Sequence, residues 1–282
     1  MAHLMAEPPN VRLKISNRSE NVLLVREVLT GVAETIELDS SDLYDIRTAV
    51  TEACNNVVLH AYEGQEGPLE VDISASADAI EVVVRDYGVG IRPRIRAPNE
   101  AALGIGLPLI QALVHSVEFT DADGRGTELR MRFLAPSRCA FEPLQEDGDV
   151  PSPADEDLVS TTALTIAPAS LARTVLPRVL SVLAARADFS TDRISDAQLV
   201  ADSLAAHAPS SLGSDRLSLT VSVKARNLEL CVGPLGAGRA DRLILDSDVD
   251  GLGPVIEKLT DDRRVAAVGS SEVLALQLVD RE

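Results

Sequence analysis

Four short stretches of the sequence carry residue types that could do chemistry. The first, TEACNNVVLHAY (residues 51–62), places Glu52 and Asn56 four positions apart. On a helix, two such residues lie one above the other. A carboxylate and a carboxamide at the edge of a core must be hydrogen-bonded or must ligate something. The alternative for this stretch is a solvated helix face, or an asparagine that caps a nearby loop.

The second stretch, VVVRDYGVGI, ends an apolar strand at Asp86 and continues with Gly88 and Gly90. The glycines allow the chain to turn and a ligand to approach the backbone. An aspartate at a strand end can accept a hydrogen bond from an exocyclic amine such as that of adenine. The alternative is an Asp-x-Gly hairpin turn, which is common.

The third stretch, LGIGLPLI, places Gly104 and Gly106 before an expected helix, whose free N–H groups and dipole favour anions. The fourth, GRGTELRMRF, opens an expected strand with Gly126 and Thr127. By itself this last pattern is explained by a glycine turn and a β-branched strand residue. The four stretches together, in this order, form a much more specific pattern than any one of them.

The elements that must position these residues are predicted from hydrophobic periodicity. Helical spacing and strand alternation follow one another along the first half, with helices clustered early and hairpins late. We expect helices at 21–33, 43–62 and 105–114, and strands at 11–15, 69–76, 79–86, 116–120 and 127–134. This order predicts an α+β fold, a two-layer sandwich with helices on one face of a mostly antiparallel sheet.

An acidic segment, residues 141–160, divides the chain. It holds seven acidic residues, three prolines and no basic residue, so it cannot bury a core and is typical of a solvated linker. We therefore expect one domain at 1–140 and a second at 161–282.

Composition limits the classes of partner. The net charge of −18 disfavours nucleic acid or an anionic membrane as a main partner, because both require a basic surface, and it favours a basic protein. The three scattered cysteines, Cys54, Cys139 and Cys231, argue against a disulfide framework or a metal cage. The sequence shows neither a signal pattern nor an apolar run of about 18 residues, so we expect a cytoplasmic protein.

Taken together, the four stretches resemble the GHKL ATPases, which have the Bergerat-type fold. TEACNNVVLHAY and VVVRDYGVGI, with a first helix NVLLVREVL, are more closely similar to bacterial anti-sigma factors that are serine protein kinases. The resemblance covers about residues 10–135. It implies ATP and Mg²⁺ as cofactors, and it implies a sigma factor and an anti-anti-sigma (STAS-type) protein as partners. The implied reaction is phosphorylation of a serine on the anti-anti-sigma protein.

The resemblance implies a role for each side chain of the first two stretches. Glu52 would be the general base that positions the attacking hydroxyl. Asn56 would ligate Mg²⁺, a hard cation that takes oxygen ligands. Asp86 would take the adenine amino group. Phosphoryl transfer depends on such positioning and on charge neutralisation more than on covalent chemistry.

The remaining implied contacts are made largely by backbone. Gly88 and Gly90 would bring the chain close to the base. Gly104 and Gly106, with the helix that they open, would receive phosphate oxygens. Thr127 would support the adenine through its hydroxyl or through water.

The segment at residues 92–102 corresponds to the lid over ATP in such proteins, and here it is short. Its arginines, Arg92, Arg94 and Arg96, could pair with phosphate; the alternative is exposed surface charge. Arg26 and its neighbours on the first helix could contribute to a binding surface. A short lid bears on catalytic rate and substrate choice rather than on nucleotide binding.

The second half repeats part of the first. Residues 228–238 align without gaps on residues 80–90, with Gly236 and Gly238 at the glycine positions and Pro234 at the position of Asp86. We expect a duplicated domain that has lost the adenine aspartate and the Glu-x-x-x-Asn pair. It would pair with the first domain, as a pseudo-dimer in place of a homodimer, or would dock a partner. The alternative is an unrelated α+β domain.

The leading hypothesis is an ATP-dependent anti-sigma factor with serine kinase activity. The first rival is a non-catalytic, ATP-binding regulatory adaptor. The second is a phosphotransfer component of a two-component system, which requires an exposed histidine on a helix that accepts phosphate. None of the four histidines, His3, His60, His115 and His207, lies in such a context in the sequence.

Overall fold

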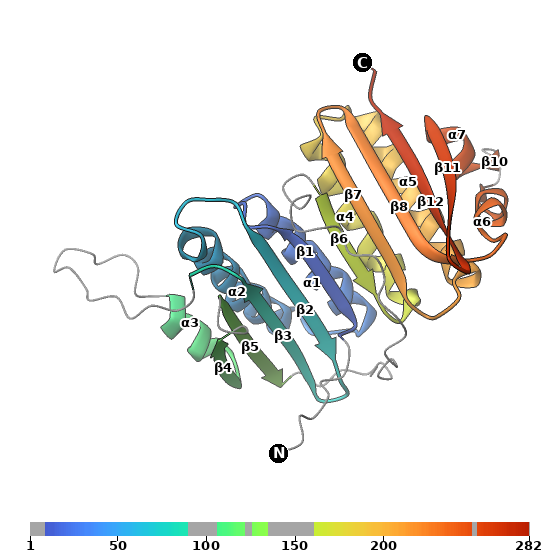
Figure 1. Ribbon diagram of the computed structural model, residues 1–282. Coiled ribbons are helices and arrows are strands. Elements are labelled where there is room, and N and C mark those ends of the chain that lie inside the picture. Colours follow the sequence, from blue (N-terminus) through green and yellow to red (C-terminus); the bar gives the residue numbers. More distant parts are fainter. Residues whose placement is uncertain (1–8, 90–105, 122–125, 135–160, 250–252, 282) are drawn as a thin grey trace. The chain divides into compact units, whose positions relative to one another are not determined.

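The computed structural model describes residues 9–89, 106–121, 126–134, 161–249 and 253–281, and the chain forms two compact units (Figure 1). Arg12–Glu142 make up one unit, called here the N-terminal unit. Met1–Val11 and Pro143–Glu282 make up the other, the C-terminal unit.

Among the described residues, the elements of the N-terminal unit closely follow the predicted order. They are β1 (Val11–Ser16), α1 (Asn21–Thr35), α2 (Ser40–Asn56), the π-helix η1 (Val57–Ala61), β2 (Pro68–Ala75), β3 (Ala79–Asp86), α3 (Gly106–Leu113), β4 (Ser116–Asp121) and β5 (Thr127–Leu134). One difference is that the expected helix at 43–62 begins earlier and changes to a π-helix at Val57.

The sheet of this unit has the strand order β1-β2-β3-β5-β4, and the pairs β2–β3, β3–β5 and β4–β5 are antiparallel. Helices α1 and α2 lie on one face of it (Figure 1). The core is the layer between, built from aliphatic side chains such as Val50 and Ala53 on α2 and Ile73 and Val82 on the strands, each at most 1% exposed. The predicted α+β two-layer sandwich is confirmed.

Charged residues on neighbouring strands of this sheet form a ladder of ion pairs. Asp72, which is only 4% exposed, accepts from Arg12 on β1 and from Arg85 on β3. Arg85 also reaches Glu128 on β5, and Glu128 in turn accepts from Arg130. Burial opposes ionisation of Glu128, but these two arginines outweigh it and lower the pKa of its carboxyl. The ladder joins the strands through side chains in addition to the backbone hydrogen bonds.

The C-terminal unit contains a second set of elements. Among the described residues they are β6 (Thr161–Ile166), a 3₁₀ turn η3 (Ala169–Leu171), α4 (Ala172–Arg186), α5 (Thr191–His207), a second 3₁₀ turn η4 (Ala208–Ser211), β7 (Leu217–Lys224), β8 (Asn227–Gly236), α6 (Ala240–Asp246), β9 (Asp248–Val249), β10 (Gly253–Pro254), α7 (Val255–Leu259), β11 (Asp262–Val268) and β12 (Ser271–Val279).

The two units share one topology. The main sheet of the C-terminal unit has the strand order β6-β7-β8-β12-β11. These strands take the places that β1, β2, β3, β5 and β4 take, in that order, in the sheet of the N-terminal unit. The strand registers agree as well: Ser74 pairs with Glu81, and Ser222 pairs with Glu229.

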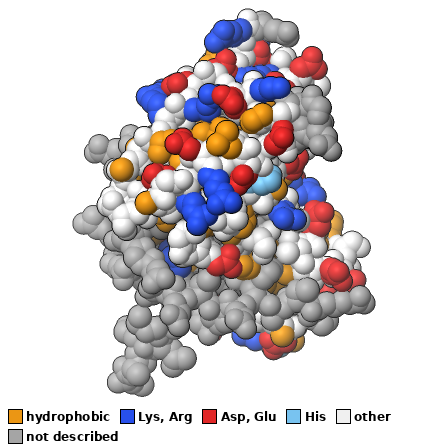
Figure 2. All heavy atoms as spheres, turned by 90° about the vertical axis from the view of Figure 1, so that its right-hand side faces the viewer, with side chains coloured by type: hydrophobic (Ala, Val, Ile, Leu, Met, Phe, Trp, Pro, Cys, Tyr) orange, Lys and Arg blue, Asp and Glu red, His pale blue; other side chains and the backbone are white. Residues whose placement is uncertain are grey.

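Acidic and basic side chains are intermingled on the face drawn in Figure 2, so the excess negative charge of the chain is not segregated there.

Candidate nucleotide site

Helix α2 carries the first pair of candidate residues. Its apolar positions, including Ile46 and Ala53, are buried against the core, and Glu52 and Asn56 lie half-buried beside that stripe. Gly106, the first residue of α3, lies against both. A Cβ added to Gly106 would stand 3.3 Å from Glu52 Oε2 and 3.6 Å from Asn56 Oδ1. The structure therefore brings two of the four predicted stretches together at the start of α3, where free backbone N–H groups favour anions.

The π-helix that follows Asn56 connects α2 to the second stretch. π-Helical turns are rare and are frequently found at functional sites. The backbone N–H of Val89 donates to the carbonyl of Ala61 at 2.9 Å. Gly88 passes so close that a Cβ on it would stand 1.9 Å from the same carbonyl oxygen. Only glycine fits at position 88, because the obstructing atom is backbone and cannot rotate away.

Asp86 ends β3 and is 4% exposed. Its Oδ1 accepts from the backbone N–H of Gly88 at 2.9 Å, and its carboxylate also bonds the hydroxyl and the backbone N–H of Thr127, its partner in the β3–β5 register. Burial raises the pKa of Asp86, and these hydrogen bonds act in the opposite direction. An ionised carboxylate has about four lone-pair sites, so it has capacity left for a further donor.

Gly126 allows the approach of β5 to Asp86. A Cβ at position 126 would stand 2.0 Å from the carbonyl oxygen of Asp86, and Gly126 has a φ of 85°, a conformation that favours glycine. The glycine before Thr127 is therefore required for two independent reasons. The second and fourth predicted stretches meet at this point.

Two further residues of this region were missed in the sequence analysis. Tyr62 is the residue after the π-helix, and its hydroxyl bonds backbone groups at the ends of both β2 and β3. Gly67 lies against the ring of Tyr62. Tyr62 ends the first stretch but was given no role there, and Gly67 lies outside all four stretches. Hydrophobic spacing gives no signal for the role of either residue. Gly90, Gly104 and the arginines at 92, 94 and 96 lie outside the described residues.

The donor set suits a hard cation bound together with phosphate. Asn56 offers an amide oxygen and Glu52 a carboxylate, beside a glycine whose missing side chain leaves room. The described residues contain no group of three or more His, Cys, Asp or Glu able to hold a metal ion by themselves. One or two protein oxygens plus phosphate oxygens and water is the usual environment of Mg²⁺ at nucleotide sites. Asn56 thus fits the implied Mg²⁺.

The corresponding positions of the C-terminal unit carry different chemistry. The buried residues Ala197, Val200, Ala201 and Leu204 of α5 repeat the spacing of the buried residues of α2 at a constant offset of 151. That offset places Ser203 at the position of Glu52 and His207 at that of Asn56. The shared register of the two hairpins places Pro234 at the position of Asp86.

Two cavities lined by described residues, one in each unit, lie at matching ends of the fold. In the N-terminal unit a cavity of about 230 Å³ lies among the start of α2, the end of α3 and the end of β5. In the C-terminal unit a cavity of about 300 Å³ lies among the start of α5, the end of α7 and the end of β12. Neither cavity is lined by a candidate site residue, and of the four stretches only Phe133, at the end of the fourth, lines one of them.

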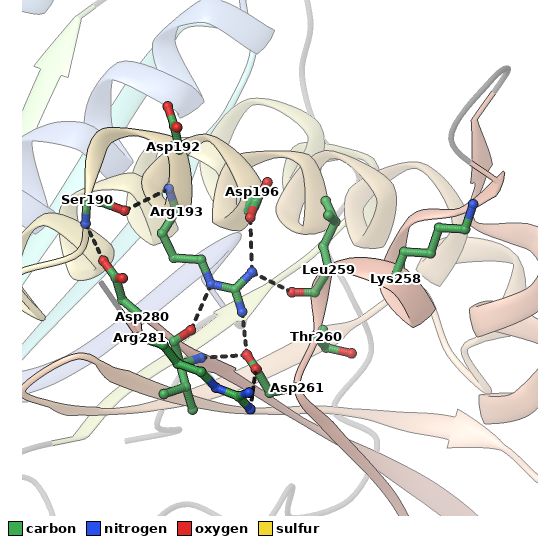
Figure 3. Close-up of a pocket in the computed structure, with 11 residues that line it drawn as sticks. Ser190, Asp192, Arg193, Asp196, Lys258, Leu259, Thr260, Asp261, Asp280 and Arg281 are labelled. Atoms are coloured by element: carbon green, nitrogen blue, oxygen red, sulfur yellow. Dashed lines mark hydrogen bonds and ion pairs between the residues drawn. The ribbon is translucent and has the colours of Figure 1, made fainter.

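Arg193 occupies the centre of the larger cavity (Figure 3). Its guanidinium donates to Asp196 and Asp261 and to the carbonyls of Leu259 and Val279. These contacts join α5, the segment after α7, and β12. We interpret the arginine as a structural cross-link, because its donors are already taken up by protein acceptors.

The described residues include no helix that is both long and apolar enough to cross a bilayer.

The comparisons with known proteins agree with the geometry of the N-terminal unit. The family described as "Histidine kinase-like ATPase domain" matches residues 15–133. This range holds all four motifs.

Two curated relatives illustrate the similarity. The chain is 26% identical over 161 residues to "Serine-protein kinase RsbW" of Bacillus mycoides, covering 52% of this chain and 95% of that protein. It is 29% identical over 129 residues to "Anti-sigma F factor" of Caldanaerobacter subterraneus, covering 43% of this chain and 90% of that protein. Both proteins are therefore matched over nearly their whole length.

Among solved structures, the RsbU and RsbW domains of a Mycobacterium tuberculosis protein align at 25% identity over 46% of this chain and 33% of that one. The TM-score of 0.34 is too low to add to the sequence comparisons. Residues 15–133 of this chain thus match the histidine kinase-like ATPase domain family, and the chain is similar over this part to a serine-protein kinase and to an anti-sigma factor, in agreement with the geometry of the N-terminal unit.

Proposed function

We propose that this chain is an ATP-dependent anti-sigma factor that binds a sigma factor and phosphorylates a serine of an anti-anti-sigma protein. The observation that carries the proposal is the position of Gly106 against Glu52 and Asn56, with the buried carboxylate of Asp86 held at the end of β3. The similarity to a serine-protein kinase and to an anti-sigma factor over nearly their full lengths supports it.

Each residue has a role that its position allows. Asp86 accepts a hydrogen bond from the adenine amino group, Thr127 supports Asp86 and the base, and Gly88 gives the base access to backbone. Asn56 holds Mg²⁺, and Gly106 leaves space for phosphate at the start of α3. Two further glycines complete the assignment, Gly90 on the base side and Gly104 on the phosphate side.

Glu52 is the general base of the transfer. Bound Mg·ATP supplies the phosphoryl group, and the cation neutralises the charge on its oxygens. Glu52 accepts the proton of the partner's serine hydroxyl as the new O–P bond forms and the bond from the γ-phosphorus to ADP breaks. Glu52 is half-buried beside Gly106, at the space where the phosphates would be bound.

We further propose that the C-terminal unit is a degenerate copy of the ATPase domain that binds no nucleotide. Its strand order and hairpin register match those of the N-terminal unit. Proline at position 234 offers no carboxylate to adenine, and Ser203 and His207 replace the base and the metal ligand.

The test of the kinase is transfer of label from γ-labelled ATP to candidate anti-anti-sigma proteins, with retention of sigma factors measured in parallel by pull-down. Glu52→Gln keeps the size of the side chain and removes the base. We expect it to reduce transfer by about 10²–10⁴-fold and to leave ATP affinity unchanged. Transfer at the wild-type rate would overturn the role of Glu52. ATP binding by the wild-type chain without transfer to any candidate would instead indicate a non-catalytic adaptor.

The metal ligand has a matched control next to it in the chain. Asn55 and Asn56 are neighbours on α2, about 100° apart around the helix. We expect Asn56→Ala to abolish the Mg²⁺-dependent part of ATP binding in calorimetry, and Asn55→Ala to preserve it. An equal loss in both variants would contradict the assignment of Mg²⁺ to Asn56.

A further inference from the structure

The hydroxyl of Tyr62 bridges two backbone groups at the end of the β2–β3 pair. It donates to the carbonyl of Pro68 at 2.5 Å and accepts from the N–H of Tyr87 at 2.8 Å. The last paired residues of the two strands are Leu69 and Asp86, so Pro68 and Tyr87 are the next pair in the antiparallel register. The hydroxyl therefore joins two groups that would otherwise face each other across the ladder.

The ring of Tyr62 is held in place from the side by Gly67. A Cβ at position 67 would stand 2.2 Å from Cε1 of the ring and 2.5 Å from Cζ. Gly67 is itself fixed by two hydrogen bonds with Asn17, one from each backbone N–H, at 2.9 Å. The ring thus packs on an immobilised stretch of backbone, and its hydroxyl has little freedom to move.

Residues 61 and 62 together hold the turn that follows Asp86. Val89 N–H donates to the carbonyl of Ala61, and Tyr87 N–H donates to the hydroxyl of Tyr62. The Gly88 N–H between them donates to Asp86 itself. The helix that carries Glu52 and Asn56 continues into the π-helix that ends at Ala61, so one continuous helical segment fixes both halves of the site.

We propose that Tyr62 is a positioning residue, whose hydroxyl sets the placement of the Asp86 carboxylate and so determines the selectivity of the site for adenine. The inference rests on the proposed nucleotide site. Tyr62 acts through Tyr87, the residue after Asp86, and makes no contact with the base. A merely structural role would change stability without changing selectivity between purines.

The test compares ATP with ITP by calorimetry on the full chain in the presence of Mg²⁺. ITP carries an oxygen in place of the adenine amino group, so it offers Asp86 no donor at that position. We expect wild type to prefer ATP and Tyr62→Phe to reduce the ratio of ATP to ITP affinity by about fivefold, the effect of one net hydrogen bond. Affinity for ITP should change much less than affinity for ATP.

Tyr44→Phe is the matched control, because Tyr44 lies on α2, the helix that leads through the π-helix to Tyr62, and is 71% exposed. It should preserve the ratio. Amide hydrogen exchange gives a second readout without ligand: in Tyr62→Phe the Tyr87 amide should exchange faster, while the interior amides of β3 stay protected.

The outcomes separate the two proposals. If wild type prefers ATP and Tyr62→Phe keeps that preference, or if its two affinities fall by equal factors, the positioning role is overturned and the ATP site stands. If the folded wild type binds neither nucleotide, the ATP site is overturned and this inference with it. Unchanged exchange at Tyr87 would overturn the role even where the variant is too unstable for calorimetry.

Discussion

Gly106 lies against Glu52, with only 3.3 Å between the place of an added Cβ and the Oε2 atom, although 53 residues separate the two in the chain. The contact puts the start of α3 beside the side chains of α2. The free N–H groups of a helix start favour phosphate, and so would Mg²⁺ held by its proposed ligand Asn56. This small space is therefore where we expect the phosphates to be bound.

Gly106→Ala fills that space with one methyl group. The nearest atoms belong to the flexible side chains of Glu52 and Asn56, which can move by a few tenths of an ångström. Alanine also reduces the conformational freedom of the unfolded chain relative to glycine, which stabilises the folded state by about 0.4–1 kcal/mol where the backbone conformation suits it. We therefore expect unchanged or slightly increased thermal stability, together with at least a fivefold loss of Mg·ATP affinity, a reduction of about 1 kcal/mol in binding free energy.

Gly213→Ala is the control for this change, because a Cβ at position 213 meets nothing within 4 Å. It should leave binding at the wild-type level. Full Mg·ATP affinity in Gly106→Ala, measured by calorimetry, would show that phosphate binds elsewhere.

Asp86→Asn separates stability from recognition. Burial raises the pKa of Asp86 above its ordinary value, so the folded state binds this proton more readily than the unfolded state does. The resulting stabilisation is present at low pH and is lost as pH rises through the raised pKa, after which the buried carboxylate is a cost. Asparagine removes that cost and keeps an oxygen for Gly88 N–H.

We therefore expect Asp86→Asn to melt at or above the wild-type temperature at pH 7, with a difference that shrinks as pH falls through the raised pKa of Asp86. Its preference for ATP over ITP should be lost, because an amide accepts less strongly than a carboxylate. Thermal melts at several pH values, with calorimetry at pH 7, check both parts. A variant that is less stable than wild type at pH 7 would mean that the hydrogen bonds to the carboxylate outweigh its burial.

Periodicity located the elements of the N-terminal unit well because their burial is regular. The strand at 79–86 is a run of mostly buried residues and the strand at 127–134 alternates in burial over most of its length, and their predicted bounds agree with those of β3 and β5. The pattern of α2 was also predicted, but the change to a π-helix at Val57 was not. The apolar residues keep helical spacing through that point, and the reason for the change lies in the contacts of Ala61 with Gly88 and Val89, 27 and 28 positions away.

Motifs identified which residues could form a site, and only the fold shows which of them meet. The contacts of Gly106 with Glu52 and of Gly126 with Asp86 depend on element packing that spacing does not specify. Tyr62 could not be found from the sequence, because an aromatic residue at the end of an apolar helix is most simply read as core. The ion-pair ladder around Asp72 depends on strand registers that were not predicted.

Ser203 is buried, and its hydroxyl forms no hydrogen bond with any of the described residues. A buried hydroxyl without a partner costs about 1–3 kcal/mol. We expect Ser203→Ala to raise the stability of the C-terminal unit by about 1 kcal/mol, measured as the free energy of unfolding in denaturant.

Ser195→Ala is the matched control on the same helix, because Ser195 is exposed and its hydroxyl bonds the carbonyl of Thr191. Both substitutions change helix propensity in the same way. The difference between their free energies of unfolding therefore reports the effect of burying the Ser203 hydroxyl. Equal effects would mean that the Ser203 hydroxyl finds a partner in solution.

The last prediction concerns the number of nucleotides bound. Both units have the same strand order, yet the chain should bind one ATP and not two. At the position of Asp86 the C-terminal unit has Pro234, whose side chain offers no acceptor for a hydrogen bond from the adenine amino group. Glu272 on the neighbouring strand accepts from the backbone N–H groups of Gly238 and Ala240, which lowers the pKa of its carboxyl.

In the C-terminal unit, therefore, the chain's own carboxylate already occupies the backbone donors after the glycine turn, and a nucleotide would have to displace it. Calorimetry with Mg·ATP should give one site per chain, and Asp86→Ala should abolish all measurable binding. The matched substitution Glu272→Ala should leave the stoichiometry and affinity unchanged. Two sites in wild type would mean that the C-terminal unit binds nucleotide as well, and one site that survives Asp86→Ala would place the nucleotide in the C-terminal unit and reverse the assignment of the two domains.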